Sequence, residues 1–373
     1  MKERLFGKTL AQLGEVASQA GLPRFAARQI AGWIYRKNAC SVAAMTDVSA
    51  SGRAFLESRY EIGRSAPVRE TVSVDGTKKY LFATGGGVYT PDGGLTASGG
   101  GVVSSEGSFV EAAMIPDTSR ENGGDRATLC VSSQAGCRMG CDFCATGRQG
   151  LAHNLTAGDI LNQFASLPER DALTNIVYMG MGEPLDNPDE VLRSLEILTS
   201  DWGYGWSPTR ITVSTAGVAP ALERLLAESR AHLAVSLHNP FSDERARIMP
   251  IERAYPIESV VEIVRRHFLR GTAAPGSAQR RVSFEYIVMK GLNDSPRHVD
   301  GLAKLLNGLS CRINLIRFHK IPGSPYFSPD AATMERFRDA LTRKGFTTTI
   351  RASRGEDIEA ACGLLSTKQA ARG

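Results

Sequence analysis

Hydrophobic positions recur with different periods along the chain, and the change of period divides it into regions. In residues 1–62 the period is helical. One helical face there carries four large apolar side chains: Phe25, Ile30, Trp33 and Ile34. The arginines and lysines between them fall on other faces, so we predict a small N-terminal helical accessory domain with a basic surface.

Residues 63–120 change to short runs in which apolar and polar positions alternate. Such runs over 70–74, 79–82 and 109–111 predict the strands of a small β region. Between the last two lies a glycine-rich tract at 85–108, which has too few apolar residues to pack. We expect this tract to be a mobile loop without a chemical role.

Residues 121–366 alternate short β-branched runs with helical segments, the pattern of repeated β-α units around a parallel sheet. Six runs are predicted to be strands: 128–132, 175–179, 210–214, 232–237, 282–288 and 312–316. Helices are expected after Thr156, which has Asp159 three residues on as a capping signal, and after Pro188, Pro256 and Pro296. The predicted fold class is therefore α/β, with a partial (β/α)6 barrel as the catalytic domain and a short tail at 367–373.

Chemically active residue types follow the ends of the predicted strands. Three cysteines follow the first strand and Gly182-Glu183 the second, while Ser214 ends the third and Ser236 and His238 lie at the end of the fourth. The active sites of parallel β/α barrels lie at the carboxyl ends of their strands. We therefore expect these residues to share one site.

The cysteines Cys137, Cys141 and Cys144 form a C-x-x-x-C-x-x-C motif. Three thiolates on a [4Fe–4S] cube leave one iron open for a small molecule, which makes such a site reactive. The competing interpretation is a structural zinc site with His153 as a fourth ligand. No second pair of cysteines with zinc-finger spacing follows, so we favour the iron–sulfur cluster and take His153 as a loop residue.

Composition narrows the class of protein without deciding it. Among 373 residues there are seven cysteines, and the crowding of three of them within eight positions indicates metal binding in a reducing compartment. No apolar run approaches the roughly 18 residues of a membrane span, and the first residues lack a signal-peptide core. A net charge of +5 permits a nucleic-acid partner but does not require one. We predict a cytoplasmic protein without a membrane partner.

The run from Cys130 to Cys144 closely resembles the RlmN/Cfr family of radical S-adenosylmethionine (SAM) adenine methyltransferases. Further stretches resemble family motifs in the family's order: 179–184, 213–217, 236–238, 345–349, 354–358 and 361–363. The resemblance covers roughly residue 109 to the C-terminus and, more loosely, the N-terminal domain. It implies a radical SAM barrel with one [4Fe–4S] cluster and SAM as cofactors.

The resemblance also implies a mechanism. Carbon 2 of adenine is not nucleophilic, so its methylation needs a radical route, which the cofactor supplies. One SAM methylates Cys362, and a radical made from a second SAM removes hydrogen from that methyl group, which then adds to the base. Cys130 attacks the sulfur of Cys362 and releases the product through a transient disulfide, while Glu111 accepts a proton. Without the resemblance, Cys130 and Cys362 would be interpreted as small buried hydrophobic residues. Cys362 lies in an apolar run that we expect to be helical. Glu111 would be interpreted as a solvated strand residue.

SAM contacts follow from the same resemblance. They are Gly182, Glu183, Ser214, Ser236, Leu237, His238 and His319. Glu183 suits the amino group, because a carboxylate and an ammonium form a charge-assisted hydrogen bond. The family usually has asparagine where this chain has His319, and an imidazole offers a similar donor and acceptor.

The implied substrate is an adenosine of 23S rRNA in the peptidyl-transferase region, with adenosine 37 of tRNA as a second substrate. We expect the N-terminal domain to grip RNA together with a basic segment: Arg265, Arg266, Arg270, Arg280 and Arg281. A monomer served by a reductant such as flavodoxin or ferredoxin is expected. Three alternatives stay open, namely methylation at carbon 8, a radical SAM activase acting on a protein, and a non-catalytic RNA-binding protein with a structural metal.

Overall fold

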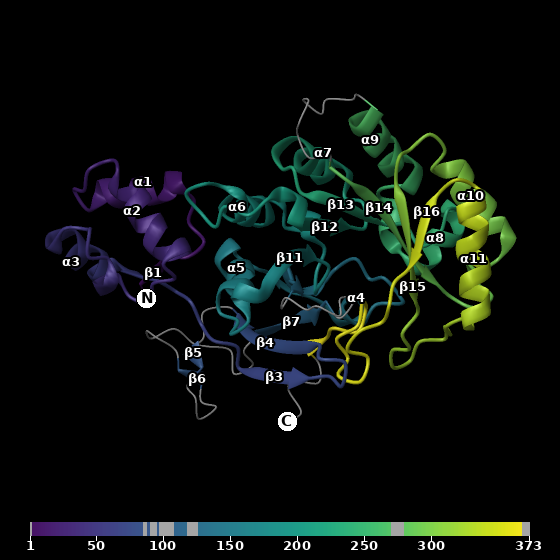
Figure 1. The fold of residues 1–373 in the computed structure, drawn as a ribbon, viewed down its shortest axis with the longest axis horizontal. Coiled ribbons are helices and arrows are strands. Elements are labelled where there is room, and N and C mark those ends of the chain that lie inside the picture. Colours follow the sequence, from purple (N-terminus) through teal and green to yellow (C-terminus); the bar gives the residue numbers. More distant parts are fainter. Residues whose placement is uncertain are drawn as a thin grey trace.

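A mixed sheet of ten strands forms the centre of the molecule (Figure 1). The computed structural model describes residues 2–84, 88–89, 95–96, 108–117, 126–269 and 280–367. Seven neighbouring strands are parallel: β16 (Thr347–Ile350), β15 (Arg312–Arg317), β14 (Val282–Val288), β13 (His232–Ser236), β12 (Ile211–Thr215), β11 (Leu173–Tyr178) and β8 (Ala127–Cys130). Antiparallel strands extend the sheet beyond β8: β7 (Ser108–Pro116), β4 (Lys78–Thr84) and β3 (Arg69–Val72).

All six predicted barrel strands are present, and the sheet differs from the prediction at both ends. The threonine-rich strand β16 adds a seventh parallel strand beside β15. At the other end, β7 pairs directly with β8, with Ala113 opposite Cys130. The expected small β region is therefore present, as an antiparallel extension of the main sheet.

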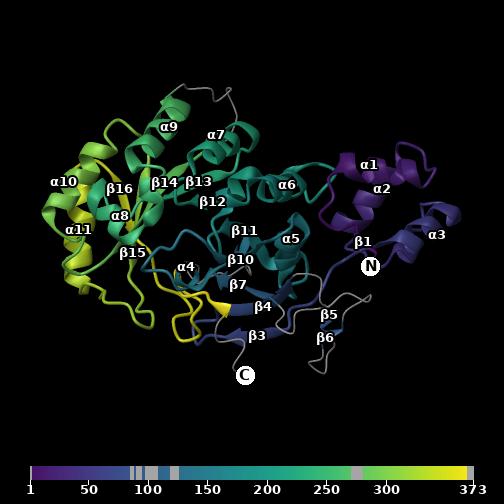
Figure 2. The same ribbon diagram turned by 180° about the vertical axis from the view of Figure 1, so that it is seen from behind.

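Helices cover the outer side of the parallel strands (Figures 1 and 2). They are α5 (Ala157–Ala165), α6 (Pro188–Thr199), α7 (Ala219–Glu228), α9 (Ile257–Leu269), α10 (Pro296–Leu305) and α11 (Ala331–Arg343), with the shorter α8 (Ser242–Ile248) near the strand ends. The predicted starts are confirmed. Thr156 and Asp159 form a capping box before α5, and α6 and α10 begin with proline, whose missing N–H costs nothing in the first turn.

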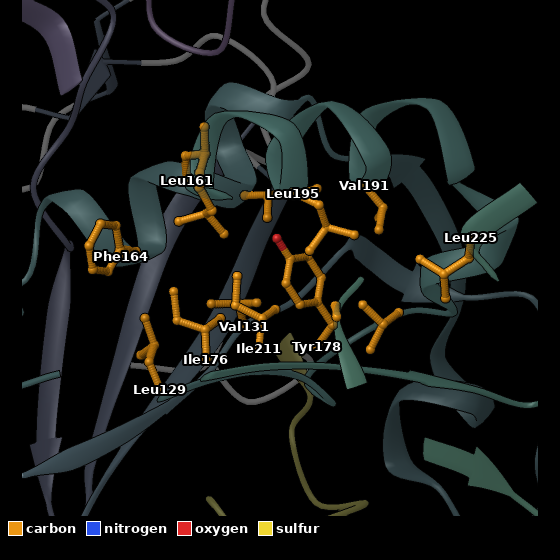
Figure 3. Packing of buried hydrophobic residues seen from close by; sticks show 14 of the residues in the cluster. Leu129, Val131, Leu161, Phe164, Ile176, Tyr178, Val191, Leu195, Ile211 and Leu225 are labelled. Atoms are coloured by element: carbon orange, nitrogen blue, oxygen red, sulfur yellow. The ribbon is translucent and has the colours of Figure 1, made fainter. Parts of the chain in front are cut away.

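The main core lies between these helices and the sheet (Figure 3). Side chains from three strands, and from Val131 directly after β8, meet side chains from α5, α6 and α7: Leu129, Val131, Ile176, Tyr178 and Ile211 against Leu161, Phe164, Val191, Leu195 and Leu225. Tyr178 is the polar exception, and its hydroxyl shares a 2.8 Å hydrogen bond with Ser194 Oγ. This packing fixes the positions of the strand ends where the site forms.

The N-terminal region is helical, as predicted, with two short strands that close it. Its elements are β1 (Glu3–Arg4), α1 (Leu10–Gln19), α2 (Ala26–Ala31), the π-helix η1 (Gly32–Arg36), the 3₁₀ turn η2 (Val42–Ala44), α3 (Ala50–Arg59) and β2 (Tyr60–Glu61). It packs against the barrel through Tyr35, which contacts the rings of Trp202 and Tyr204. Gly7 lies so close to α5 that a Cβ on it would be 2.4 Å from the nitrogen of Gly158.

Several segments named in the sequence analysis lie outside the described residues or away from the strand ends. Most of the glycine-rich tract and Arg270 lie outside the described residues. Arg281 adjoins the amino end of β14, whereas the cysteines lie at the carboxyl ends of the parallel strands. Arg266 forms an ion pair with Glu223. The basic segment is therefore not beside the predicted site. An RNA bound by both this segment and the N-terminal domain, as we expected, would have to extend across the barrel.

Candidate active site at the carboxyl ends of the parallel strands

The three motif cysteines line one cavity of about 150 Å³. Cys137 ends β9 (Gln134–Cys137), Cys141 lies in the following loop, and Cys144 precedes α4 (Ala145–Gln149). The loop depends on Gly136, where a Cβ would be 1.9 Å from the carbonyl oxygen of Gly150 in β10 (Gly150–Asn154). The sequence motif is thus folded around a shared space.

The environment of these thiols suits a bound cation. Burial raises the pKa of Cys137 to about 12 and also raises that of Cys141 and Cys144. Buried thiolates therefore need a cation to compensate their charge, which a cluster provides. In the described part of the chain, no three His, Cys, Asp or Glu side chains converge as they do around a single metal ion. All three cysteines line the wall of the same cavity.

His153 lies in a strand and not in the loop that we expected. It is part of β10 and pairs with Ala135 of β9. Its Nε2 atom is buried without a hydrogen-bond partner in the described structure, and the side chain does not line the cysteine cavity.

Glu183 lies in the wall of the cysteine cavity, after β11, and is held on both sides. Its Oε2 accepts a hydrogen bond from the backbone N–H of Ala216 at 2.8 Å, and its Oε1 accepts one from Leu185 at 3.0 Å. Burial raises its pKa to about 7. The neighbouring Gly182 has a φ of +98° and passes close to Gln134. Glycine is favoured at this position because it has no Cβ to strain the backbone or to collide with Gln134. A carboxylate oxygen has lone pairs for further donors, so Glu183 can still receive an amino group.

The predicted SAM contacts on the next two strands are also in this wall, except Leu237. Ser214 of β12, Ser236 of β13 and His238 line the cavity. His238 Nδ1 accepts a hydrogen bond from the N–H of Ile287 at 3.0 Å, and burial lowers its pKa to about 3. The ring is therefore neutral and carries its proton on Nε2. Leu237 packs in the core and lines no described cavity, so its contribution is limited to its backbone.

Arg245, which no sequence motif singled out, holds these strand ends together. The guanidinium is fully buried and donates to three carbonyl oxygens, those of Ala216, Ser236 and Leu237, each at 2.9 Å. It also pairs with the buried carboxylate of Glu252. The signal in the sequence was weak, because an arginine in a short exposed-looking helix usually faces solvent.

A second cavity of about 110 Å³ brings Cys130 and Cys362 together. Cys130 ends β8, and burial raises its pKa to about 12, with the sulfur of Cys362 as the next cause. Cys362 lines both cavities, as do Met179 and Arg351. The two cysteines thus share a site that continues into the cavity of the motif cysteines.

The segment that carries Cys362 forms turns, so our expectation of a helical run from Ile358 to Leu365 was wrong. After β16 the chain runs back to lie beside α4 (yellow in Figure 1). There the N–H of Ala145 donates to the carbonyl of Gly363 at 2.8 Å, directly after Cys144. Contacts to the main sheet at the turn before β4 hold the other end, where Asp75 accepts from the N–H of Gly355 at 2.9 Å.

Glu111 is buried in β7 and contacts the same C-terminal segment. Its carboxylate is 3.1 Å from Lys79 Nζ and accepts a hydrogen bond from the N–H of Ser366 at 2.9 Å. Burial raises its pKa, while Lys79 opposes that shift. Its side chain lines neither cavity. The expectation of a solvated strand glutamate was wrong, because the returning C-terminal segment covers it.

His319 lines the second cavity and not the cavity of the motif cysteines. Its Nδ1 is 2.7 Å from a carboxylate oxygen of Glu356, and its Nε2 is 3.3 Å from Ser353 Oγ. Burial lowers its pKa, and Glu356 works against that shift. The structure thus separates His319 from the other residues predicted to contact SAM.

Comparison with known proteins gives a consistent result. The radical SAM superfamily model matches residues 131–302, and the model of the ribosomal RNA large subunit methyltransferase N-terminal domain matches residues 4–62. A probable dual-specificity RNA methyltransferase RlmN of Porphyromonas gingivalis (strain ATCC BAA-308 / W83) is 54% identical over 366 residues, which are 98% of this chain and 97% of that protein. One of the same name from Parabacteroides distasonis is 52% identical with the same coverage.

Among solved structures, a radical SAM methyltransferase from Sphaerobacter thermophilus is 39% identical, with a TM-score of 0.81. The match covers 97% of this chain and 99% of that one. Fold, cysteine site and near full-length identity agree, and the chain belongs to the RlmN family of radical SAM enzymes.

Proposed function

We propose that this protein methylates carbon 2 of an adenosine in 23S rRNA, in the peptidyl-transferase region, with adenosine 37 of tRNA as a second substrate. The relatives named dual-specificity RNA methyltransferases support RNA as the substrate class. The observation that carries the proposal is the joined pair of cavities, in which Cys362 faces both the motif cysteines and Cys130.

The residues present fit the cofactors of this chemistry. Cys137, Cys141 and Cys144 would hold a [4Fe–4S] cluster, and the wall formed by Gly182, Glu183, Ser214, Ser236 and His238 would hold SAM. When bound, the two together supply a carbon-centred radical that abstracts hydrogen. His319 lies in the second cavity, so its proposed contact with the adenosyl group requires SAM to reach that cavity.

The protein's own residues then carry the methyl group. In this proposal the Cys362 sulfur accepts a methyl from one SAM, and the methyl carbon, after losing hydrogen, bonds to carbon 2 of the base. The Cys130 thiolate then attacks the Cys362 sulfur and forms a disulfide, which breaks the bond between sulfur and the transferred carbon and leaves its electron pair on that carbon, where a proton completes the methyl group. The one electron left from the radical would be accepted by the oxidised iron–sulfur cluster. Glu111 accepts the proton that the ring loses, for which the segment around Ser366 must release its carboxylate.

The N-terminal domain is the proposed RNA-binding module, in line with its match to the large-subunit methyltransferase domain. A small reductant such as flavodoxin or ferredoxin would supply electrons, and we propose a monomer. None of the helices in the described ranges is long and apolar enough to cross a membrane.

The test is anaerobic reconstitution with iron and sulfide, followed by reaction with SAM, a reductant and ribosomal RNA, and nucleoside mass spectrometry. The proposal predicts 2-methyladenosine. Appearance of 8-methyladenosine would favour the carbon-8 alternative. SAM cleavage without RNA methylation would favour an activase, and a zinc-loaded, iron-free protein that binds RNA would favour a non-catalytic role.

A further inference from the structure

Glu285 is a buried carboxylate in the middle of strand β14, a position where parallel strands normally carry apolar side chains. It is 3% exposed and lines the cavity of the motif cysteines. None of the stretches that resemble family motifs in this sequence includes it. A charged side chain at such a position is retained only where it has partners or a ligand.

Only one of its two oxygens is satisfied. Oε1 accepts hydrogen bonds from Ser283 Oγ at 2.9 Å and from Asn314 Nδ2 at 2.8 Å. Oε2 is shielded from solvent and has no hydrogen-bond partner in the described structure. The nearest cation is Arg351, whose Nη1 is 3.7 Å away, which balances charge but is too long for a hydrogen bond. Buried acceptors are nearly always paired, so an unpaired oxygen on a side chain that lines a cavity indicates a ligand that donates an N–H or O–H.

The position of Glu285 in the sheet indicates which part of a ligand it meets. Glu285 lies directly opposite Ser236 in the pairing of β13 with β14. Ser236 also lines the cavity, as does Ser214 on the next strand. In the proposed function the amino-acid end of SAM lies at the cysteines and Glu183. The adenosyl end must therefore extend along the other walls, where these two serines and Glu285 are found.

We propose that Glu285 binds the ribose of SAM, with Oε2 accepting a hydrogen bond from a ribose hydroxyl. The inference rests on the proposed function, because it takes SAM as the ligand of this cavity. A ribose diol offers two O–H donors and no positive charge, which matches an acceptor whose charge Arg351 already balances. The same pairing of a carboxylate with a ribose hydroxyl is used by dinucleotide-binding folds.

The substitution Glu285→Gln tests this with little change of shape. The glutamine oxygen can keep the bonds from Ser283 and Asn314, and its amide then presents N–H₂ where Oε2 was. A ribose hydroxyl that faces this amide must accept instead of donate, so the bond to a charged acceptor is lost and only a weaker neutral one can replace it. Ser283→Ala is the matched control inside the site, since it removes a partner of Oε1 and leaves Oε2 unchanged. Glu335→Gln on the exposed face of α11 controls for the loss of a charge.

The experiment is equilibrium dialysis of cluster-reconstituted protein against radiolabelled SAM, and against its 2′-deoxy and 3′-deoxy ribose analogues, without RNA. Iron content and a melting curve verify that each variant is loaded and folded. For the wild type we expect one of the two analogues to bind roughly tenfold to hundredfold more weakly than SAM, the cost of a lost hydrogen bond to a charged group. Glu285→Gln should bind SAM more weakly than the wild type does, and the affinity that it loses on changing from SAM to that analogue should be smaller than in the wild type.

Three results would overturn the inference. The first is SAM binding by Glu285→Gln at wild-type affinity, and the second is an equal loss of affinity for the analogue in both proteins. The third is normal SAM binding with a loss of affinity for RNA measured in parallel, which would assign Glu285 to the substrate base. Failure of the wild type itself to bind SAM would instead overturn the proposed function.

Discussion

Cys130 and Cys362 line the same cavity, although one ends the first barrel strand and the other lies in the final turn of the described chain. They share this cavity because the segment after β16 returns across the site and attaches beside Cys144. Cys362 thereby faces the motif cysteines on one side and Cys130 on the other. A methyl carrier and the thiol that releases its product need this arrangement.

Replacing Cys130 by alanine should leave RNA covalently attached to the protein. In the proposed mechanism Cys130 breaks the bond between the Cys362 sulfur and the transferred carbon, so without it the adduct accumulates. A denaturing gel of radiolabelled RNA after reaction should show a protein-sized shift with Cys130→Ala, and none with Cys311→Ala. Free methylated RNA from Cys130→Ala in normal yield would contradict the assignment.

Replacing Gly7 by alanine should loosen the N-terminal domain. The residue has a φ of +93°, and a Cβ would be 2.4 Å from the nitrogen of Gly158, so backbone must move. We expect a loss of about 1–3 kcal/mol in the free energy of unfolding, measured with urea, and weaker RNA binding.

Gly14→Ala is the matched control in helix α1, because open space surrounds its Cβ position. Alanine there should stabilise the protein by about 0.5–1 kcal/mol. Equal effects of the two substitutions would show that the contact between Gly7 and Gly158 does not hold the domain in place.

The features that could be predicted from the sequence are those that depend on residues close together in the chain. Six strands and the helix starts at Thr156, Pro188 and Pro296 were predicted correctly, because periodicity and capping are local. Strand β16 was missed because a run of threonines has no apolar alternation, and its pairing with β15 depends on the whole barrel. The turns around Cys362 were misread for a related reason, since contacts with distant residues such as Asp75 determine that segment.

The same limit applies to the site. The cysteine motif and the strand-end residues could be found because spacing and position carry their chemistry. Arg245 and Glu285 carry no motif, and their roles arise from partners on other strands. For Glu285, a carboxylate inside an apolar strand was the available signal.

Replacing Arg245 by methionine should destabilise the protein strongly, because it leaves the buried Glu252 carboxylate and three carbonyl groups without their donor. A loss of roughly 3–5 kcal/mol in the free energy of unfolding is expected. Arg247→Met on the same helix removes an exposed arginine and should change stability by less than about 0.5 kcal/mol. Similar urea midpoints for the two variants would refute the role of Arg245.

The stability of the cluster-free protein should fall as pH rises from about 4.5 to about 7. Burial raises the pKa of Glu183 from 4.5 to about 7, so the folded state keeps a proton that the unfolded state has lost in this window. Linkage then predicts that the free energy of unfolding falls by an amount on the order of 3 kcal/mol as the pH rises through this window. Unfolding by urea at several pH values should show this slope in the wild type and a flatter one in Glu183→Gln. Identical slopes would argue against the buried, protonated state.

The central claim is that Cys362 carries the methyl group, and peptide mass spectrometry tests it most directly. Reconstituted protein is incubated with methyl-deuterated SAM, digested before or after RNA is added, and compared with Cys362→Ala. The account predicts a deuterated methyl on the Cys362 peptide that disappears when the label enters RNA, and no labelled RNA from Cys362→Ala. Labelled adenosine made by Cys362→Ala, with no methyl on the wild-type peptide, would contradict it.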